Sequence, residues 1–161
     1  MALIKNKLLF IGILIFSISS LLFAYFVEYI LEHPPCNLCL IERIPYMAAI
    51  LLVSFVLFFG KYEKIISISI GLFFIFGTII SFYHFGIEQG FFNESLVCDL
   101  DENNKAMTAQ DLLKELEAKS VSCKDVSFRV FGLSLATFNT IISFVISGIM
   151  IITSINYEKN Q

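Results

Sequence analysis

The chain has 161 residues, of which 57% are hydrophobic and 16% charged, and its formal net charge is −3. An ordinary soluble domain is about 45–50% apolar and about 25% charged, so this composition excludes a typical soluble enzyme and a disordered chain. The negative net charge and the lack of a continuous row of basic residues in the sequence also exclude a nucleic-acid binder,.

Four long uncharged runs divide the chain, at residues 8–27, 44–60, 65–87 and 130–157. A membrane-spanning helix needs roughly 20 mostly apolar residues, and backbone in hydrocarbon must satisfy its hydrogen bonds internally. We therefore predict an all-α integral membrane protein, a four-transmembrane-helix bundle that forms a single domain over residues 1–161. The predicted spans are about 8–30, 38–59, 65–87 and 131–155, joined by outer loops at about 31–37 and 88–130.

The basic residues indicate which ends of the spans face the cytoplasm. They gather near the two termini and between the second and third spans, at Lys5, Lys7, Lys61, Lys64 and Lys159. The short loop between the first two spans, residues 28–35, has no Lys or Arg. Because short basic loops stay cytoplasmic, we expect both termini inside and the two outer loops outside.

The second outer loop is the part of the chain with soluble-like composition. Within it, Thr108-Ala109-Gln110-Asp111 is similar to a helix-capping box,. Leu112, Leu113 and Leu116 follow at helical spacing,. We predict a short amphipathic helix here, which lies on the membrane surface or packs on its own loop.

All four cysteines fall on the predicted outer side: Cys36, Cys39, Cys98 and Cys123. An even number of cysteines confined to one face is typical of an oxidising compartment. Placement alone is equally consistent with two inert disulfides that hold the outer loops.

Cys36-Asn37-Leu38-Cys39 is a C-x-x-C motif at the predicted membrane surface. This spacing closes a very short loop and suits a pair that cycles between dithiol and disulfide, whereas a structural disulfide gains more from a long loop. A closed zinc site would need Cys98 and Cys123 as its other ligands, and these do not form a second C-x-x-C. We therefore predict no metal.

Two polar residues stand inside predicted spans. Arg43 follows Cys39 by four residues, so both share a face of one helix, and a guanidinium there would favour the thiolate of Cys39. His84, near the outer end of the third span, lies at the depth expected for Arg43, and the two could frame a polar headgroup such as a quinone. The alternatives are an Arg43 that reaches the lipid headgroups, paired with Glu42, and an ordinary interfacial His84.

The C-x-x-C motif with Arg43 and the segment around His84 together resemble motifs of the disulfide bond formation protein B (DsbB) family. Residues 35–43, Pro35-Cys36-Asn37-Leu38-Cys39-Leu40-Ile41-Glu42-Arg43, are similar to its first periplasmic motif. Tyr83-His84-Phe85-Gly86-Ile87-Glu88-Gln89-Gly90 is similar to the end of its third span, and Phe131-Gly132-Leu133-Ser134 to the entry of its fourth. Cys98 and Cys123 match its second-loop pair. Residues 134–139 lack the Pro and Trp that many members have there.

The resemblance implies a quinone-dependent protein-disulfide oxidoreductase of the bacterial inner membrane, with its redox cysteines on the periplasmic side. Such a protein reoxidises a periplasmic thioredoxin-fold, DsbA-like oxidase and passes the electrons to ubiquinone or menaquinone. By matching position, Cys98 would take the mixed disulfide with the partner, and Cys123 would be its disulfide mate. Cys36 would exchange with that pair, and Cys39 would face a quinone held by Arg43 and His84.

Two other functions fit part of the pattern. A vitamin K epoxide reductase-like protein also joins cysteines to a quinone, but its C-x-x-C lies late in the chain, after the loop cysteines. A non-enzymatic four-span protein with a disulfide-linked outer loop would explain the spans and the loop cysteines. It would leave Arg43 and the C-x-x-C at a helix mouth unexplained.

Overall fold

A computed structural model of the chain describes residues 2–60, 62–93, 98, 123–124, 129–130 and 132–159. Its elements, in chain order, are α1 (Ala2–Tyr29), α2 (Asn37–Ile41), α3 (Ile44–Phe59), α4 (Glu63–Glu88), β1 (Arg129–Val130), β2 (Leu133–Ser134) and α6 (Leu135–Lys159). Four stretches are long and apolar enough to cross a membrane: Lys7–Tyr29, Asn37–Phe59, Glu63–Glu88 and Leu135–Asn156. The prediction of an all-α protein with four membrane-spanning helices is confirmed. The short helix expected at about residues 108–117 lies outside the described residues.

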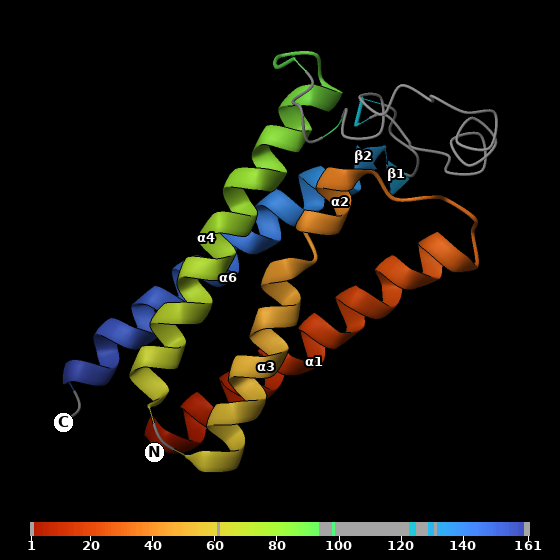
Figure 1. Cartoon of the computed structure of the whole chain (residues 1–161). Helices are drawn as coiled ribbons and strands as arrows, with labels where there is room; N and C mark the ends of the chain where they lie inside the picture. The colour runs from red at the N-terminus through yellow and green to blue at the C-terminus, as the bar shows by residue number, and fades with distance from the viewer. Residues whose placement is uncertain are drawn as a thin grey trace, which may run out of the picture.

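The long helices pack in a chain of neighbours, with α1 against α3, α3 against α4, and α4 against α6 (Figure 1). Their apolar core contains Phe10, Tyr46, Val53, Ile70, Phe74 and Met150. Small residues let α4 approach its neighbours closely, as is common between membrane helices. A Cβ at Gly71 would lie 3.2 Å from Ile151 Cγ1, and one at Gly77 would lie 2.9 Å from Pro45 Cγ.

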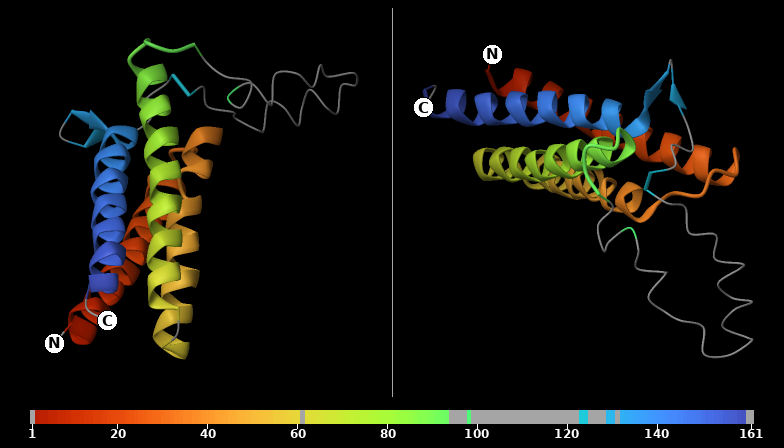
Figure 2. Two further views of the ribbon diagram at one scale, coloured as in Figure 1. Left: turned by 90° about the vertical axis from the view of Figure 1, so that its left-hand side faces the viewer. Right: turned by 90° about the horizontal axis from the view of Figure 1, so that it is seen from above.

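The two ends of the bundle carry different parts of the chain. Both termini and the turn between α3 and α4 lie at one end in two views of the ribbon (Figures 1 and 2). The opposite end holds α2, the carboxyl end of α4 and the β1–β2 hairpin that precedes α6. The C-x-x-C motif and His84 therefore lie toward the end away from the termini.

The second span, predicted as one helix over about 38–59, is broken into α2 and α3 at Glu42 and Arg43. Pro45 explains the break, because it has no N–H to donate to the carbonyl of Ile41 one turn earlier. Arg43 occupies the N-cap position of α3, with Pro45 in the first turn. Glu42 and Arg43 nevertheless keep right-handed helical backbone angles through the break.

The fourth helix begins at Leu135, later than the predicted start near residue 131. β1 and β2 pair antiparallel just before it, with Arg129 opposite Ser134. The turn between them contains Gly132 at φ +84°, a backbone conformation that does not continue a right-handed helix. Ser134 then caps α6, because its Oγ accepts the N–H of Thr137 at 3.3 Å,.

Candidate active site

The C-x-x-C motif forms the amino-terminal turn of α2. Cys36 is the N-cap residue, and its sulfur accepts the backbone N–H of Cys39 at 3.2 Å. Both cysteines are free, Cys36 is buried, and their sulfur atoms lie 2.6 Å apart. Because a disulfide needs a separation of about 2.05 Å, oxidation of this pair requires little movement.

Hydrogen bonding lowers the pKa of the Cys36 thiol from 9.0 to about 5. The largest cause is the hydrogen bond with the Cys39 side chain, and contacts with His84 act in the same direction, against the opposing effect of burial. This direction favours the thiolate of Cys36 in the reduced form. The thiolate is the species that attacks disulfides.

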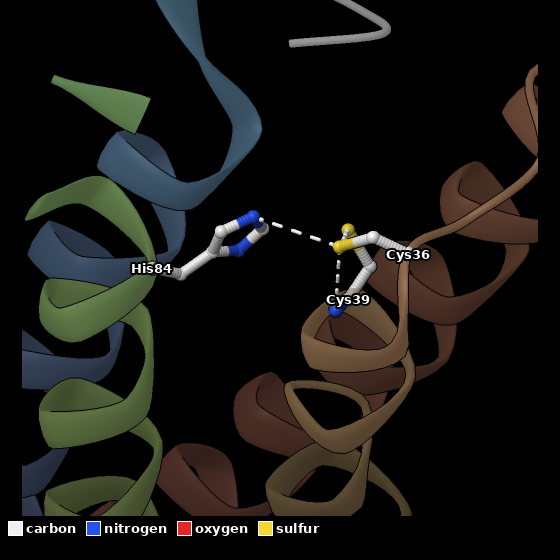
Figure 3. A group of neighbouring side chains, drawn as sticks. All are labelled: Cys36, Cys39 and His84. Atoms are coloured by element: carbon white, nitrogen blue, oxygen red, sulfur yellow. Dashed lines mark hydrogen bonds between the residues drawn. The ribbon is translucent and has the colours of Figure 1, made fainter. Parts of the chain in front are cut away.

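His84 reaches the cysteine pair from α4, as the close-up shows (Figure 3). Its Nε2 atom lies 3.6 Å from Cys36 Sγ, and its Nδ1 atom lies 2.7 Å from Glu42 Oε1. Glu88 approaches the same ring, with Oε1 3.8 Å from Nε2. His84 is thus held between a carboxylate and a reactive sulfur, rather than standing alone at the membrane interface.

Glu42 is a site residue whose role the sequence reasoning missed, since it was considered there only as a partner for Arg43. Its second oxygen, Oε2, accepts Asn139 Nδ2 of α6 at 2.7 Å. The same amide nitrogen lies 2.7 Å from Ser81 Oγ on α4, and Asn139 Oδ1 accepts the hydroxyl of Tyr46 on α3 at 2.5 Å. Because these polar groups are hydrogen-bonded to one another, the network fixes the arrangement of their side chains. An asparagine in an otherwise apolar span was the signal that could have identified it.

Arg43 has a different partner from those expected. Its NH1 atom donates to Glu28 Oε2 of α1 at 2.6 Å, and the guanidinium stacks over the ring of Tyr25 at 5.0 Å. The sequence placed this charge beside Cys39 or paired it with Glu42. Arg43 and Cys39 line the same cavity, so the placement of this charge beside the cysteine pair stays a prediction. Glu28 of α1, rather than Glu42, is the carboxylate that pairs with Arg43.

These polar residues share a cavity of about 470 Å³ between α1, the α2–α3 segment, α4 and α6. The cavity is lined by four residues that the sequence analysis had singled out, Cys36, Cys39, Arg43 and His84. It is also lined by Glu42, Glu88 and Asn139. Much of the remaining wall is apolar and comes from α1 and α6, with Phe16, Leu21, Phe23, Val27, Leu135, Phe138 and Ile142. The volume falls within the roughly 300–1,000 Å³ of small-molecule pockets.

The outer-loop cysteines lie next to the C-x-x-C motif. Cys98 and Cys123 form a disulfide with a Cα–Cα distance of 5.9 Å, the pairing that the resemblance implied. Cys123 is buried in one cluster with Cys36, Leu38 and Ile87, and Cys39 and Cys98 pack against that cluster. All four cysteines thus belong to one packed cluster beside α2.

Comparison with known proteins identifies the family. The family model described as "Disulfide bond formation protein DsbB" matches residues 6–153. The chain belongs to the DsbB family. It is also 26% identical over 141 residues to the uncharacterized protein RP370 of Rickettsia prowazekii (strain Madrid E), covering 86% of this chain and 82% of that protein. No solved structure matches the chain.

Membership of the DsbB family makes this chain a multi-pass membrane protein of disulfide bond formation and a disulfide oxidoreductase. It favours the oxidoreductase prediction over a non-enzymatic four-span protein. The C-x-x-C motif precedes the loop cysteines in this chain, an order that also favours the DsbB family over a vitamin K epoxide reductase-like protein.

Proposed function

We propose that this DsbB-family protein reoxidises a periplasmic, DsbA-like dithiol oxidase and transfers the two electrons to membrane quinone. The observation that carries the proposal is that the free Cys36–Cys39 pair lies between a cavity and a disulfide. The pair lines the 470 Å³ cavity and also packs against the Cys98–Cys123 disulfide. In the proposed reaction a soluble dithiol would meet the loop disulfide at the half-buried Cys98, and a lipid-soluble oxidant would enter the cavity.

Disulfide exchange would proceed first between the partner and the loop pair, and then between the two cysteine pairs of the chain. A partner thiolate attacks Cys98, which forms a mixed disulfide and releases Cys123 as a thiolate. The second thiol of the partner then displaces Cys98, so the partner leaves oxidised and the loop pair is reduced. Once Cys36 and Cys39 are joined in a disulfide, a loop thiolate would attack Cys36 and release Cys39 as a thiolate. The second loop thiol would then displace Cys36, which re-forms the Cys98–Cys123 disulfide and leaves Cys36 and Cys39 as the reduced pair.

A quinone bound in the cavity would supply the acceptor for two electrons and two protons. The residues present fit such a ligand, because the walls are largely apolar and a few polar groups converge on the cavity,. Arg43 would donate to the quinone headgroup through its guanidinium, and His84 would donate through Nε2 when that atom carries a proton. Cys39, which is less buried than Cys36 and lines the same cavity, would face the ring.

The same proposal places the protein in the bacterial inner membrane with both termini cytoplasmic. The basic residues near the termini and at Lys61 and Lys64 favour that orientation. The C-x-x-C end of the bundle would then face the periplasm, where disulfides persist.

The purified full chain in detergent, supplied with ubiquinone or menaquinone and a reduced DsbA-like protein, tests the proposal. We expect loss of the quinone absorbance together with loss of partner thiols, and no continued turnover when quinone is omitted. Cys39→Ser should stop quinone reduction while the loop disulfide still exchanges with the partner. Thr153→Ala, a change in a half-buried threonine of α6 that does not line the cavity, should leave turnover unchanged. Absence of quinone-dependent oxidation by the folded native chain would overturn the proposed function.

The direction of electron flow has its own test. A partner that lacks its second cysteine should accumulate as a covalent adduct, and mass spectrometry should find it on Cys98. An adduct on Cys36 or Cys39 would reverse the proposed path.

A further inference from the structure

The reduced cysteine pair and His84 form a cluster of metal-ligand atoms. Cys36 Sγ, Cys39 Sγ and a ring nitrogen of His84 all lie within 4.8 Å of one another, and the cluster is largely buried. Two thiolates and one imidazole are a ligand set that Zn²⁺ uses at sites that keep a fourth position open. From the sequence, a zinc site was expected to need Cys98 and Cys123 beside the C-x-x-C cysteines. In the structure Cys98 and Cys123 are bonded to each other, and His84 takes the third place.

The surroundings of His84 are those of a metal-binding histidine. A carboxylate can only accept a hydrogen bond, so the 2.7 Å contact with Glu42 Oε1 places the proton on Nδ1. Nε2 faces Cys36 Sγ at 3.6 Å, and once it has given up its own proton it presents a lone pair to the cluster. Histidines that bind metals almost always donate their other N–H to such a partner. Asn139 holds the remaining oxygen of Glu42 at 2.7 Å.

Glu88 offers a fourth donor atom, an oxygen, next to the same histidine. Its Oε1 atom lies 3.8 Å from His84 Nε2, and its side chain is 6% exposed. Its Oε2 atom is buried and has no hydrogen-bond partner among the residues that the structure describes. A buried carboxylate oxygen that lacks a donor and lines the same cavity as both cysteines is suited to approach a cation.

We propose that the reduced protein binds one thiophilic divalent ion, Zn²⁺ or Cd²⁺, through Cys36 Sγ, Cys39 Sγ and His84 Nε2, with Glu88 completing the coordination. Binding releases to solvent the protons that Cys36 Sγ, Cys39 Sγ and His84 Nε2 still carry. Zinc–sulfur bonds of about 2.3 Å hold two tetrahedral sulfur ligands roughly 3.8 Å apart, so the cysteine side chains move away from disulfide geometry. The ion and the Cys36–Cys39 disulfide therefore exclude each other. On the proposed function, an ion here would stop electron transfer by trapping the pair in the reduced state.

Cadmium binding to the full chain in detergent tests the site without any electron-transfer assay. The protein carries Cys98→Ser and Cys123→Ser, so that Cys36 and Cys39 are its only cysteines, and circular dichroism checks that it remains helical. It is stripped of quinone, reduced with a phosphine under nitrogen and titrated with Cd²⁺, while the sulfur-to-cadmium charge-transfer absorbance is recorded. We expect one ion per chain, displacement by Zn²⁺, and no band after the pair is oxidised.

Single substitutions in that background assign the ligands. Glu42→Gln should weaken Cd²⁺ binding by about 10- to 100-fold, the usual cost of losing a partner of a ligating histidine. His84→Gln should weaken it at least as much, and His33→Gln, a change in the other histidine of the chain, should not. Equal Cd²⁺ affinity of the parent and His84→Gln, or no charge-transfer band in the folded reduced parent, would overturn the site. Because no quinone or partner is present, failure of the proposed function would leave these binding results unchanged.

Discussion

His84 Nδ1 lies 2.7 Å from Glu42 Oε1, although the two residues are 42 positions apart in the chain. The contact joins α4 to the break between α2 and α3 and orients the imidazole so that Nε2 faces Cys36. A carboxylate paired with an imidazole beside a reactive sulfur controls both the charge and the direction of the ring. The reactivity of Cys36 therefore depends on a residue that is not itself part of the C-x-x-C motif.

The first prediction concerns the pH dependence of Cys36. With its pKa lowered to about 5, Cys36 in the reduced protein should be alkylated at a nearly constant rate at neutral pH. The rate should fall as the pH drops through about 5, because protonation removes the thiolate. Cys39→Ala should move this midpoint upward most, since the Cys39 side chain is the largest cause of the shift, and His84→Gln should also raise it. Mass spectrometry of iodoacetamide-treated protein measures the rate, and a native midpoint near 9 would contradict the prediction.

The second prediction concerns Arg43 in the electron-transfer reaction. Arg43→Ala should slow the quinone step about tenfold to hundredfold, because a hydrogen bond to a charged group contributes about 1.5–3 kcal/mol. Arg43→Lys should restore only part of the rate, since an ammonium does not reproduce the planar guanidinium. Stopped-flow quinone reduction by the reduced chain gives the rates.

Glu28→Gln is the matched control for Arg43, because it weakens the 2.6 Å ion pair but keeps the guanidinium. We expect it to slow the quinone step less than Arg43→Ala does. Unchanged quinone kinetics in Arg43→Ala would leave the arginine with an anchoring role only.

The third prediction concerns the hydrogen bonds of Asn139. Asn139→Leu has a similar size but removes the donor to Glu42 and the acceptor for Tyr46. Leaving buried polar groups without partners costs about 1–3 kcal/mol each, so the variant should unfold at a lower temperature in detergent. Thr153→Val, which removes an exposed hydroxyl bonded only to the backbone of its own helix, should change the unfolding temperature little. Equal unfolding temperatures of the two variants would show that the network does not stabilise the bundle.

The fourth prediction concerns the contact of α4 with α3. In Gly77→Ala the new Cβ would lie 2.9 Å from Pro45 Cγ. Overpacking of this kind costs about 1–3 kcal/mol. Gly148→Ala adds the same methyl group where nothing lies within 4 Å, and should be neutral or stabilising by up to about 1 kcal/mol. Denaturation in mixed micelles compares the two, and a stable Gly77→Ala protein would mean that α3 can shift without cost.

The fifth prediction concerns orientation in the membrane. In a chain whose own cysteines are replaced by serine, a cysteine placed at Tyr62, in the turn between α3 and α4, should not react with an impermeant thiol reagent added from outside. A variant that keeps only Cys98 should react. Labelling of intact cells or spheroplasts distinguishes them, and outside labelling at position 62 would overturn the proposed orientation.

Sequence alone determined the four spans and the grouping of the cysteines at one end of the bundle. Both follow from local properties, because a run of about 20 apolar residues must form a helix in hydrocarbon wherever it packs. The selection of Arg43 and His84 also came from sequence, since a charged or titratable side chain is costly inside a span. The sequence placed all four cysteines correctly relative to the spans without specifying which atoms touch.

Tertiary structure decided the partners of those residues. The pairing of His84 with Glu42, of Glu42 with Asn139, and of Arg43 with Glu28 joins residues far apart in the chain. Which faces meet depends on how each helix is rotated about its axis. Helices that are apolar all round carry little sequence signal for that rotation, and close packing at small residues such as Gly77 sets it instead.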